Sequence, residues 1–344
     1  MTATQPLDPT TPADGVTPTT SVALVLNPVK VDDADALRAD LAARCARAGL
    51  PGPLVLETTQ EDPGVSMARD AVAAGATVVA VAGGDGTVRA VAEGLTGTGV
   101  ALAVVPQGTG NLLARNLGLP LAVDAALDAV VDGTDRRVDV GRLTGPGVDG
   151  TVFAIMAGAG FDAAMMREAP EGLKAAVGWP AYIVGGARGL RRQHARVVLR
   201  VDGGEPVRAR VRTVLVGNLG KLQGGLELLP DARPDDGLLD VALVAPRGPL
   251  DWARLLWRGL TGRHVRDHRL RTWQAREVDV RLLRPQPRQV DGDLVADGDR
   301  LVATVEPGAL VVRVPRDAEH ALESTRPAEG TVTGPGPAGP PQTR

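Results

Sequence analysis

Residues 76–87 read ATVVAVAGGDGT, an apolar β-branched run that ends in glycines around a single aspartate. The run from Val78 to Ala82 predicts a buried strand, and the glycines predict a tight turn into a helix that begins near Thr87. Backbone N–H groups in such a turn, together with the positive end of the helix dipole, can bind phosphate. Asp85 is unusual there, because a carboxylate beside phosphates is repulsive unless a metal or a hydroxyl mediates, and we expect the charge to have no structural use in this turn. For this stretch alone, an ordinary glycine-rich turn is the alternative interpretation.

A second glycine loop follows the next apolar run. Residues 100–105, VALAVV, predict another strand, and PQGTGN at 106–111 comes directly after it. The carboxyl ends of neighbouring parallel strands meet at one edge of a sheet, so the two loops should border one crevice. Neither loop matches G-x-x-x-x-G-K-[ST] or G-x-G-x-x-G, which disfavours an ordinary P-loop NTPase and an ordinary dinucleotide dehydrogenase.

Strands and helices alternate on both sides of these loops. We expect strands at 21–28, 54–59, 76–83 and 100–106, and helices at 32–49, 63–75, 87–94 and 111–117. Near-continuous apolar strands that alternate with helices indicate a parallel sheet covered on both faces. Residues 21–135 are therefore predicted to form a Rossmann-like α/β nucleotide-binding domain.

The pattern changes after about Arg136. Runs such as RVDVGRL and EVDVRLL alternate apolar and polar residues, which is typical of half-buried antiparallel strands. We expect TVFAIMAGAG at 151–160 and VRARVRTVLVGN at 207–218 each to form one strand. We predict a second, mainly antiparallel β domain at 136–317, with its last strand a candidate to return to the first domain. Helical stretches are expected at 171–192 and 249–262, and disorder at 1–20 and 318–344, which are rich in Thr, Pro and Gly.

The composition excludes several classes of protein. The net charge of −3 gives no nucleic-acid signature, so no nucleic-acid partner is expected. Cys45 is the single cysteine, which rules out an intramolecular disulfide and indicates a reducing, cytoplasmic compartment. No basic and apolar leader opens the chain, and no apolar run reaches the roughly 18–20 residues that span a bilayer. We therefore expect any membrane contact to be peripheral, at the inner face of the membrane.

The stretch from Asp251 to Arg276 is the candidate for that contact. It holds seven Arg against two Asp, with Trp252, Trp257 and Trp273 between them. Arginine with tryptophan suits anionic head groups and the bilayer interface. A helix that packs its tryptophans into the β domain explains the same pattern equally well. The sequence leaves the oligomeric state open, a homodimer included.

Taken in order, five motifs resemble the diacylglycerol kinase catalytic-domain family. They are Asn27-Pro28 after the first strand, GGDGT at 83–87, PQGTGN at 106–111, PDARPDDG at 230–237 and VDGD at 290–293. This family includes bacterial lipid kinases and the sphingosine and ceramide kinases, and it is related to NAD kinases and phosphofructokinases. The resemblance covers roughly residues 21–315 and implies an N-terminal domain of the NAD kinase and phosphofructokinase type.

The resemblance implies that ATP binds between the two domains. By position in the motifs, the nucleotide would be held by Asn27, Pro28, Thr58, Gly83, Gly84, Asp85, Gly86, Thr87, Gly108, Thr109 and Asn111. It also implies a Mg²⁺ site in the second domain, formed by the carbonyls of Arg233 and Leu238 and the carboxylate of Asp236. Oxygen-only ligation fits magnesium. Without the resemblance, PDDG would be interpreted as an ordinary turn.

The VDGD motif supplies the candidate catalytic carboxylates. Phosphoryl transfer needs positioning, charge neutralisation and a carboxylate that accepts the hydroxyl proton. The resemblance implies that Asp291 or Asp293 is this base, and the sequence does not decide between them. Asp85 is a further candidate for contact with the substrate hydroxyl or with magnesium. The alternative is that Asp-Gly here only forms a hairpin turn.

The sequence departs from the family in two places. Residues 27–31 read Asn-Pro-Val-Lys-Val where the family has Asn-Pro-x-Ser-Gly, and Arg89-Ala90 stands where the family has Asn-Glu. Lys30 or Arg89 is a candidate to supply the missing phosphate donors. These changes affect the expected nucleotide affinity more than the reaction class.

The leading interpretation is an ATP- and magnesium-dependent lipid kinase of phospholipid biosynthesis. Its simplest reaction is conversion of diacylglycerol to phosphatidic acid, with the lipid substrate taken at the membrane surface. One alternative is an NAD kinase-like enzyme, which shares the GGDGT core. The other is a catalytically silent protein that binds nucleotide or lipid, as the altered residues 29–31 and 89–90 suggest.

Overall fold

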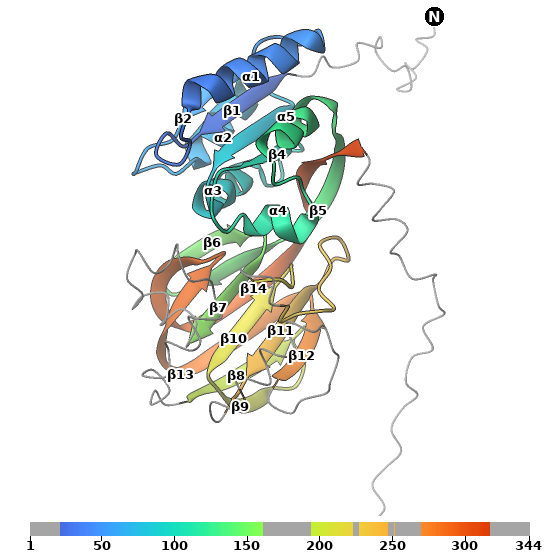
Figure 1. The fold of residues 1–344 in the computed structure, drawn as a ribbon. Helices are drawn as coiled ribbons and strands as arrows, with labels where there is room; N and C mark the ends of the chain where they lie inside the picture. Colours follow the sequence, from blue (N-terminus) through green and yellow to red (C-terminus); the bar gives the residue numbers. More distant parts are fainter. Residues whose placement is uncertain (1–20, 161–193, 223–226, 247–250, 252–269, 317–344) are drawn as a thin grey trace, which may run out of the picture.

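The computed structural model describes residues 21–160, 194–222, 227–246, 251 and 270–316. The segments expected to be disordered, 1–20 and 318–344, lie outside these residues. So do the helices expected at 171–192 and 249–262, apart from Asp251. Within the described chain, an α/β domain and a β-rich domain are stacked end to end (Figure 1).

The N-terminal domain is built on parallel strands in the order β2-β1-β3-β4. The strands are β1 (Val22–Leu26), β2 (Leu54–Glu57), β3 (Val78–Gly83) and β4 (Ala101–Pro106). The helices are α1 (Ala34–Arg47), α2 (Val65–Ala73), α3 (Asp85–Leu95), α4 (Leu112–Leu117) and α5 (Val123–Asp132). Val79 and Val81 enter one hydrophobic cluster, and Val78 and Ala80 enter another. The sheet is therefore covered on both faces, as its near-continuous apolar strands predict.

Two helices differ from the expectation. Helix α3 begins at Asp85, two residues before Thr87, because Gly84 takes the extended N-cap position. Helix α5 was not anticipated from the sequence. Its buried residues, Ala126, Leu127 and Val130, recur at helical spacing, a signal that the sequence interpretation overlooked.

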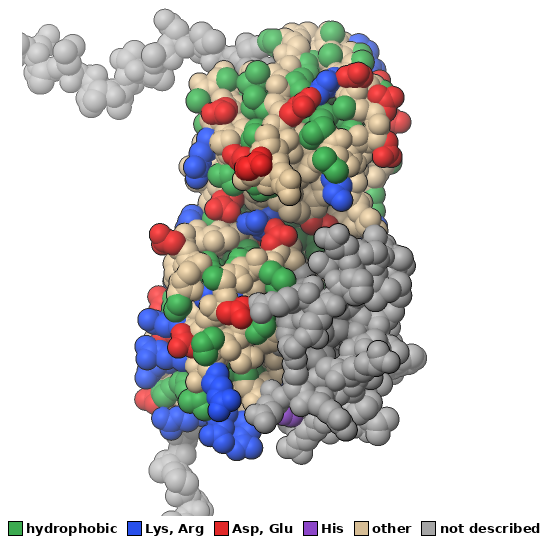
Figure 2. All heavy atoms as spheres, turned by 90° about the vertical axis from the view of Figure 1, so that its left-hand side faces the viewer, with side chains coloured by type: hydrophobic (Ala, Val, Ile, Leu, Met, Phe, Trp, Pro, Cys, Tyr) green, Lys and Arg blue, Asp and Glu red, His purple; other side chains and the backbone are tan. Residues whose placement is uncertain are grey.

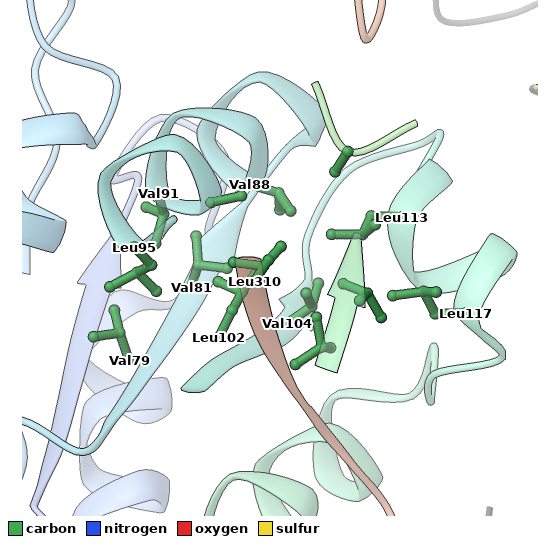
Figure 3. Close-up of a cluster of buried hydrophobic side chains, with 14 of the residues drawn as sticks. Val79, Val81, Val88, Val91, Leu95, Leu102, Val104, Leu113, Leu117 and Leu310 are labelled. Carbon is green, nitrogen blue, oxygen red and sulfur yellow. The ribbon is translucent and has the colours of Figure 1, made fainter. Parts of the chain in front are cut away.

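Helix α3 is held by a hydrophobic cluster on one face of the sheet. Val88, Val91 and Leu95 recur at helical spacing along one side of α3 and are buried. They point toward Val81 and Leu102 of the neighbouring strands β3 and β4 (Figure 3). Each fully buried side chain of this size stabilises the fold by about 1.5–3 kcal/mol. The first turn of α3, which carries the GGDGT motif, is thus fixed at the edge of the sheet.

The described part of the C-terminal domain consists of antiparallel strand pairs. Its strands are β5 (Thr134–Gly145), β6 (Val148–Phe153), β7 (Met156–Gly160), β8 (Ala195–Val201), β9 (Val207–Val211), β10 (Thr213–Gly217), β11 (Leu239–Val244), β12 (Leu270–Ala275), β13 (Glu277–Val290) and β14 (Asp293–Val314). Residues 151–160 and 207–218, each interpreted from sequence as one strand, are divided between two strands. Strand β12 lies in the Arg- and Trp-rich stretch and was not expected.

Strand β14 joins the two domains into one sheet. It spans 22 residues and pairs with β13 and β5 in antiparallel fashion. Near its end, Val311 and Val312 pair with Ala101 and Leu102 of β4 in parallel fashion. The path β12-β11-β10-β7-β13-β14-β4-β3-β1-β2 is therefore continuous through both domains. Among the helices that the structure describes, none has the length and apolar character needed to cross a bilayer.

Candidate active site

Four loops meet at one edge of the N-terminal sheet. Leu26 at the end of β1 lies in register with Glu57 of β2 and Ala82 of β3, and Gly83 lies in register with Pro106 of β4. The loops that follow these residues are therefore side by side. The connection after β1 leads to β2 on one side, and the connection after β3 leads to β4 on the other, so β1 and β3 flank a topological switch point. Open α/β sheets bind ligands at such a point.

Asn27 connects the first of these loops to helix α3. Its Nδ2 donates to Thr87 Oγ1 at 3.0 Å, and its Oδ1 accepts from the N–H of Val29 at 3.0 Å. Thr58 and Thr87 are buried beside it. Pro28 stands exposed at the surface of the loop. Asn27 thus fixes the loop while leaving its outer side open.

The start of helix α3 presents backbone N–H groups with no side-chain cap. Gly84 is the N-cap, and no side chain accepts from the first turn there. Uncapped N–H groups at a helix start, with the positive end of the helix dipole, favour an anion. The glycines also permit close packing, because a Cβ on Gly83 would lie 2.7 Å from Thr87 Cβ. A Cβ on Gly108 would lie 3.1 Å from Gly84 Cα, so the two glycine loops are in contact.

Asp85 joins the two glycine loops. Its Oδ1 accepts from the N–H of Leu112 at 2.6 Å, at the beginning of α4. Burial raises the pKa of Asp85, the N–H groups of Leu112 and Asn111 lower it, and the nearby charge of Asp293 raises it again. The expectation that a carboxylate has no structural use in this turn is therefore wrong. Asp85 holds the start of α4 against the start of α3.

Asn111 shapes the second glycine loop. Its backbone is left-handed, with φ 47°, and it precedes α4 as the N-cap residue. Its Oδ1 accepts from the N–H of Gly108 at 3.0 Å, and its Nδ2 donates to the Gly108 carbonyl at 2.7 Å. Thr109 remains exposed at the tip of the loop. Of these residues, Thr109 is the one whose hydroxyl is free to meet a ligand.

The structure separates the two aspartates of VDGD. Asp291 is buried, and its carboxylate accepts three backbone hydrogen bonds of 2.7–2.9 Å from the N–H groups of residues 154, 155 and 156. Burial raises the pKa of Asp291 to about 6, against the effect of these donors. Its backbone also adopts a left-handed φ of 46°. Asp291 therefore ties the β13–β14 turn to the connection between β6 and β7.

Asp293 faces the N-terminal domain. Its side chain is 47% exposed, and its Oδ2 accepts from Arg89 Nε at 2.9 Å. A Cβ added to Gly86 would lie 3.6 Å from the same oxygen, which places the carboxylate against the first turn of α3. The Arg89 guanidinium also pairs with Glu93 at 3.3 Å. Arg89 is thus engaged by two carboxylates, while the Lys30 side chain is exposed.

The proposed metal loop, residues 233–238, lies next to β5. Asp236 is exposed, and its Oδ1 accepts from the N–H of Leu238 at 3.0 Å. Partial burial of the Asp236 carboxyl, in an otherwise exposed residue, raises its pKa, the Leu238 N–H lowers it, and the carboxylates of Asp139 and Asp235 raise it. The loop is braced by Asp139, which accepts from the N–H groups of Gly237 at 2.6 Å and Gly308 at 2.7 Å.

The donor chemistry of this loop fits a hard cation. The carbonyls of Arg233 and Leu238 accept no backbone hydrogen bond in the described chain outside helices and strands. Nearby, Asp240 is buried with no hydrogen-bond partner for its Oδ2, and burial raises its pKa to about 6. Carboxylate and carbonyl oxygens with water are the ligands that Mg²⁺ prefers. No group of three or more His, Cys, Asp or Glu suited to a metal occurs among the described residues.

The sequence interpretation missed two buried residues that hold the site together. Asp139 is buried between two valines of a strand. Its Val-Asp-Val context could have indicated a structural role, because a buried carboxylate needs hydrogen-bond partners. Asn218 is also buried and donates to the Asp139 carbonyl at 2.7 Å and to the Ala154 carbonyl at 3.3 Å. It links the metal loop to the segment that Asp291 braces. In the sequence, the asparagine directly after the apolar run TVLVG could have indicated a buried polar residue that needs partners.

Two known domain families together match most of the chain. Residues 21–143 match the diacylglycerol kinase catalytic domain. Residues 155–314 match the YegS C-terminal NAD kinase beta sandwich-like domain. The division between the two matches falls within the β5–β7 region of the sheet.

Individual relatives give the same result. The chain is 33% identical over 276 residues to a "Probable lipid kinase YegS-like" of Pseudomonas aeruginosa, covering 79% of this chain and 88% of that protein. It is 33% identical over 252 residues to a "Diacylglycerol kinase" of Mycobacterium tuberculosis, covering 72% and 79%. A crystal structure of a diacylglycerol kinase from Bacillus anthracis superposes with a TM-score of 0.67 at 20% identity, covering 86% and 97%. That last likeness concerns the fold.

A substitution at Asp291 tests its bracing role. Asp291→Asn keeps the shape but replaces one acceptor oxygen by an amide, so at least one of the three buried N–H groups loses its partner. An unsatisfied buried donor costs about 1–3 kcal/mol. We expect the free energy of unfolding, measured by urea denaturation, to fall by this amount. The control is Asp149→Asn on the exposed side of β6, which should change stability by less than about 0.5 kcal/mol. Equal stability of both variants would contradict the assignment.

Proposed function

The chain belongs to the diacylglycerol kinase catalytic-domain family, and we propose that it transfers the γ-phosphoryl group of ATP to the hydroxyl of diacylglycerol. The observation that carries this proposal is the position of Asp293. This carboxylate comes from the β-rich domain and lies against Gly86 in the first turn of α3. A proton acceptor and a phosphate-binding helix start thus meet across the two domains. The product of the proposed reaction is phosphatidic acid, which places the enzyme in phospholipid metabolism.

The N-terminal domain supplies the nucleotide site. The uncapped N–H groups of α3 and the loop containing Gly108 border the switch point between β1 and β3. We assign the phosphates to these N–H groups, because helix starts favour anions. Asn27 and Asp85 hold the loops in place through their hydrogen bonds to Thr87 and Leu112. They are preorganising residues in this proposal.

Asp293 is the base in this proposal, and Asp291 is not. Asp291 is buried and its oxygens are occupied by backbone N–H groups, whereas Asp293 is half-exposed at the phosphate loop. In the transfer, the lipid oxygen bonds to the γ-phosphorus while the bond from that phosphorus to the β–γ bridging oxygen breaks. The hydroxyl proton passes to the Asp293 carboxylate, and ADP leaves. Little covalent help beyond this is needed, because positioning and charge neutralisation dominate phosphoryl transfer.

Arg89 gives this site a character of its own. Its guanidinium lies between Asp293 and Glu93, one turn into α3, where the family has Asn. A planar guanidinium can donate to a carboxylate and to a phosphate oxygen at once. We propose that Arg89 orients Asp293 and neutralises negative charge beside the γ-phosphate.

The magnesium assignment remains a proposal about Arg233, Asp236 and Leu238. Their carboxylate and carbonyl oxygens would hold the ion, and Asp139 would keep the loop in shape. A bound Mg²⁺ would neutralise the cluster of carboxylates around Asp236. No helix of the described chain crosses a bilayer, and we propose that the enzyme meets its lipid peripherally, from the cytoplasm.

The reaction is tested by transfer of label from [γ-³²P]ATP. We expect label to enter dispersed diacylglycerol, and not NAD, in the presence of Mg²⁺. Asp293→Asn should lower kcat at least a hundredfold with little change in melting temperature, since a lost proton acceptor is felt in turnover. Label in NAD alone would favour the NAD kinase alternative. No transfer to any lipid of a bacterial extract would favour a silent binding protein.

The role of Arg89 is tested by installing the family residue. Arg89→Asn removes a hydrogen bond between charged groups, each worth about 1.5–3 kcal/mol, so kcat/KM for ATP should fall about tenfold to a hundredfold. Arg89→Lys keeps the charge but not the planar fork and should recover part of the loss. Steady-state kinetics at varied ATP measures both. A rise in activity for Arg89→Asn would show instead that Arg89 restrains Asp293.

The metal assignment is tested by stability. A cation bound only to the folded state stabilises it by mass action. Wild-type protein should therefore melt at a higher temperature as Mg²⁺ is added, and Asp236→Ala should remove that increase. Asp231→Ala, an exposed carboxylate of the same segment, is the control and should keep it. An Asp236→Ala protein that responds to Mg²⁺ like wild type would contradict the assignment.

A further inference from the structure

Although the net charge of the chain is only −3, its two domains carry net charges of opposite sign. Residues 21–135 contain 14 Asp and Glu against 7 Lys and Arg, whereas residues 136–317 contain 29 Lys and Arg against 22 Asp and Glu. A charged surface therefore exerts a torque on the molecule, attracting one domain and repelling the other. The question is where the excess positive charge of the second domain lies.

Among the described residues, several arginines lie on one face of the β-rich sheet. Along β8, β9 and β13, alternate residues such as Val197, Leu199 and Val280 are buried in the core. The residues between them point outward, and six arginines on this side of these strands and of β14 are exposed: Arg196, Arg200, Arg208, Arg210, Arg281 and Arg300. We call these the arginine face. Figure 2 shows Lys and Arg side chains gathered on this domain, at the end away from the N-terminal sheet.

The strand register sets these arginines against one another. Arg196 lies directly opposite Arg210, and Arg281 lies directly opposite Arg300. Like charges in opposite positions on antiparallel strands destabilise the pair. Asp279 is the compensating acid, with ion pairs of 3.1 Å to Arg300 and 3.6 Å to Arg281. Among the described residues, neither Arg196 nor Arg210 forms an ion pair.

Protection of a sheet edge explains only part of this arrangement. Strand β9 pairs with β8 alone and is an edge, and charged residues on edges discourage strand pairing between molecules. That explanation suits Arg208 and Arg210. It does not suit Arg281 and Arg300, because β13 and β14 are each paired on both sides.

An exposed leucine accompanies the arginines. Leu283 follows Arg281 by two residues on the outward side of β13 and is 69% exposed. The pairing of β13 with β14 is irregular between Arg281 and Gln286, so this part of the strand is free of a regular ladder. Guanidinium groups bind phosphate head groups, and an apolar side chain beside them gains by entering the bilayer interface. A nucleic acid would bind the same arginines but would gain nothing from Leu283.

We propose that the arginine face, with Leu283, docks the protein on an anionic phospholipid surface. The inference rests on the proposed function, because a lipid kinase must approach the bilayer that contains its acceptor. Docking on this face lays the β13–β14 hairpin along the membrane. Asp293 is then at most about 24 Å from Arg300, measured along seven residues of strand at about 3.4 Å each. The acidic domain faces away from the anionic lipid.

Vesicle sedimentation without ATP tests the docking separately from catalysis. Binding is compared for vesicles of phosphatidylcholine alone and of equal parts phosphatidylcholine and phosphatidylglycerol. Wild-type protein should sediment with the anionic vesicles and be released by salt. Arg208→Gln/Arg210→Gln should weaken this binding on the order of twentyfold, because each basic residue near the surface contributes about fivefold. The control, Arg47→Gln/Arg69→Gln, makes the same change in net charge on exposed positions of the acidic domain and should bind like wild type.

A fluorescent label reports which face enters the interface. Cys45 is buried, so Leu283→Cys can be labelled selectively with an environment-sensitive thiol dye. The dye should shift to shorter wavelength when anionic vesicles are added, and a dye on Leu121→Cys in the acidic domain should not. Equal loss of binding in both double variants, no shift at 283, or binding to DNA but not to vesicles would each overturn the proposal. Because neither measurement needs turnover, docking and kinase activity can fail independently.

Discussion

The parallel pairing of β14 with β4 is the constraint on which the rest of this structure depends. Through Val311 and Val312, the last strand of the β-rich domain becomes part of the N-terminal sheet. The same strand begins at Asp293, so the candidate base and the residues that pair with β4 lie near the two ends of one strand. Burial fixes the register of paired strands, because a slip of one residue would move every side chain of the strand to the opposite face of the sheet. The two halves of the site are thereby positioned without a long interdomain linker.

Most carboxylates around the site serve the backbone rather than a ligand. Asp85, Asp139 and Asp291 each accept N–H groups of loops that no regular ladder satisfies. A buried carboxylate is costly to desolvate, and two or three N–H donors offset that cost while fixing the loop. Asp293 differs, because one arginine engages it and about half of its surface remains open. Exposure, more than residue type, distinguishes the chemical group from the supporting ones.

Local pattern in the sequence was sufficient for the parallel sheet and for both glycine loops, because apolar strands and glycine turns are determined by residues close in the chain. It was insufficient for Arg89 and Asp293, which meet across 204 residues. It also could not separate Asp291 from Asp293, since the difference between them lies in the N–H groups of residues 154–156. The run from 207 to 218 was interpreted as one strand because its turn near Arg212 carries no glycine or proline.

The β13–β14 hairpin carries the candidate base and two members of the arginine face, Arg281 and Arg300, so its rigidity would couple chemistry to the proposed docking. A buried arginine, Arg288, provides that rigidity. It donates to the carbonyls of Ala296 at 2.7 Å and Arg300 at 2.9 Å and to that of Pro146 in the neighbouring loop. A Cβ on Gly298 would lie 2.6 Å from its guanidinium carbon, so the glycine is what makes room for it. The nearby charges of Asp297 and Asp299 favour this buried guanidinium, which also satisfies three carbonyls of the loops and strands around it. In the proposed docking, the hairpin would therefore transmit the orientation set at the membrane directly to Asp293.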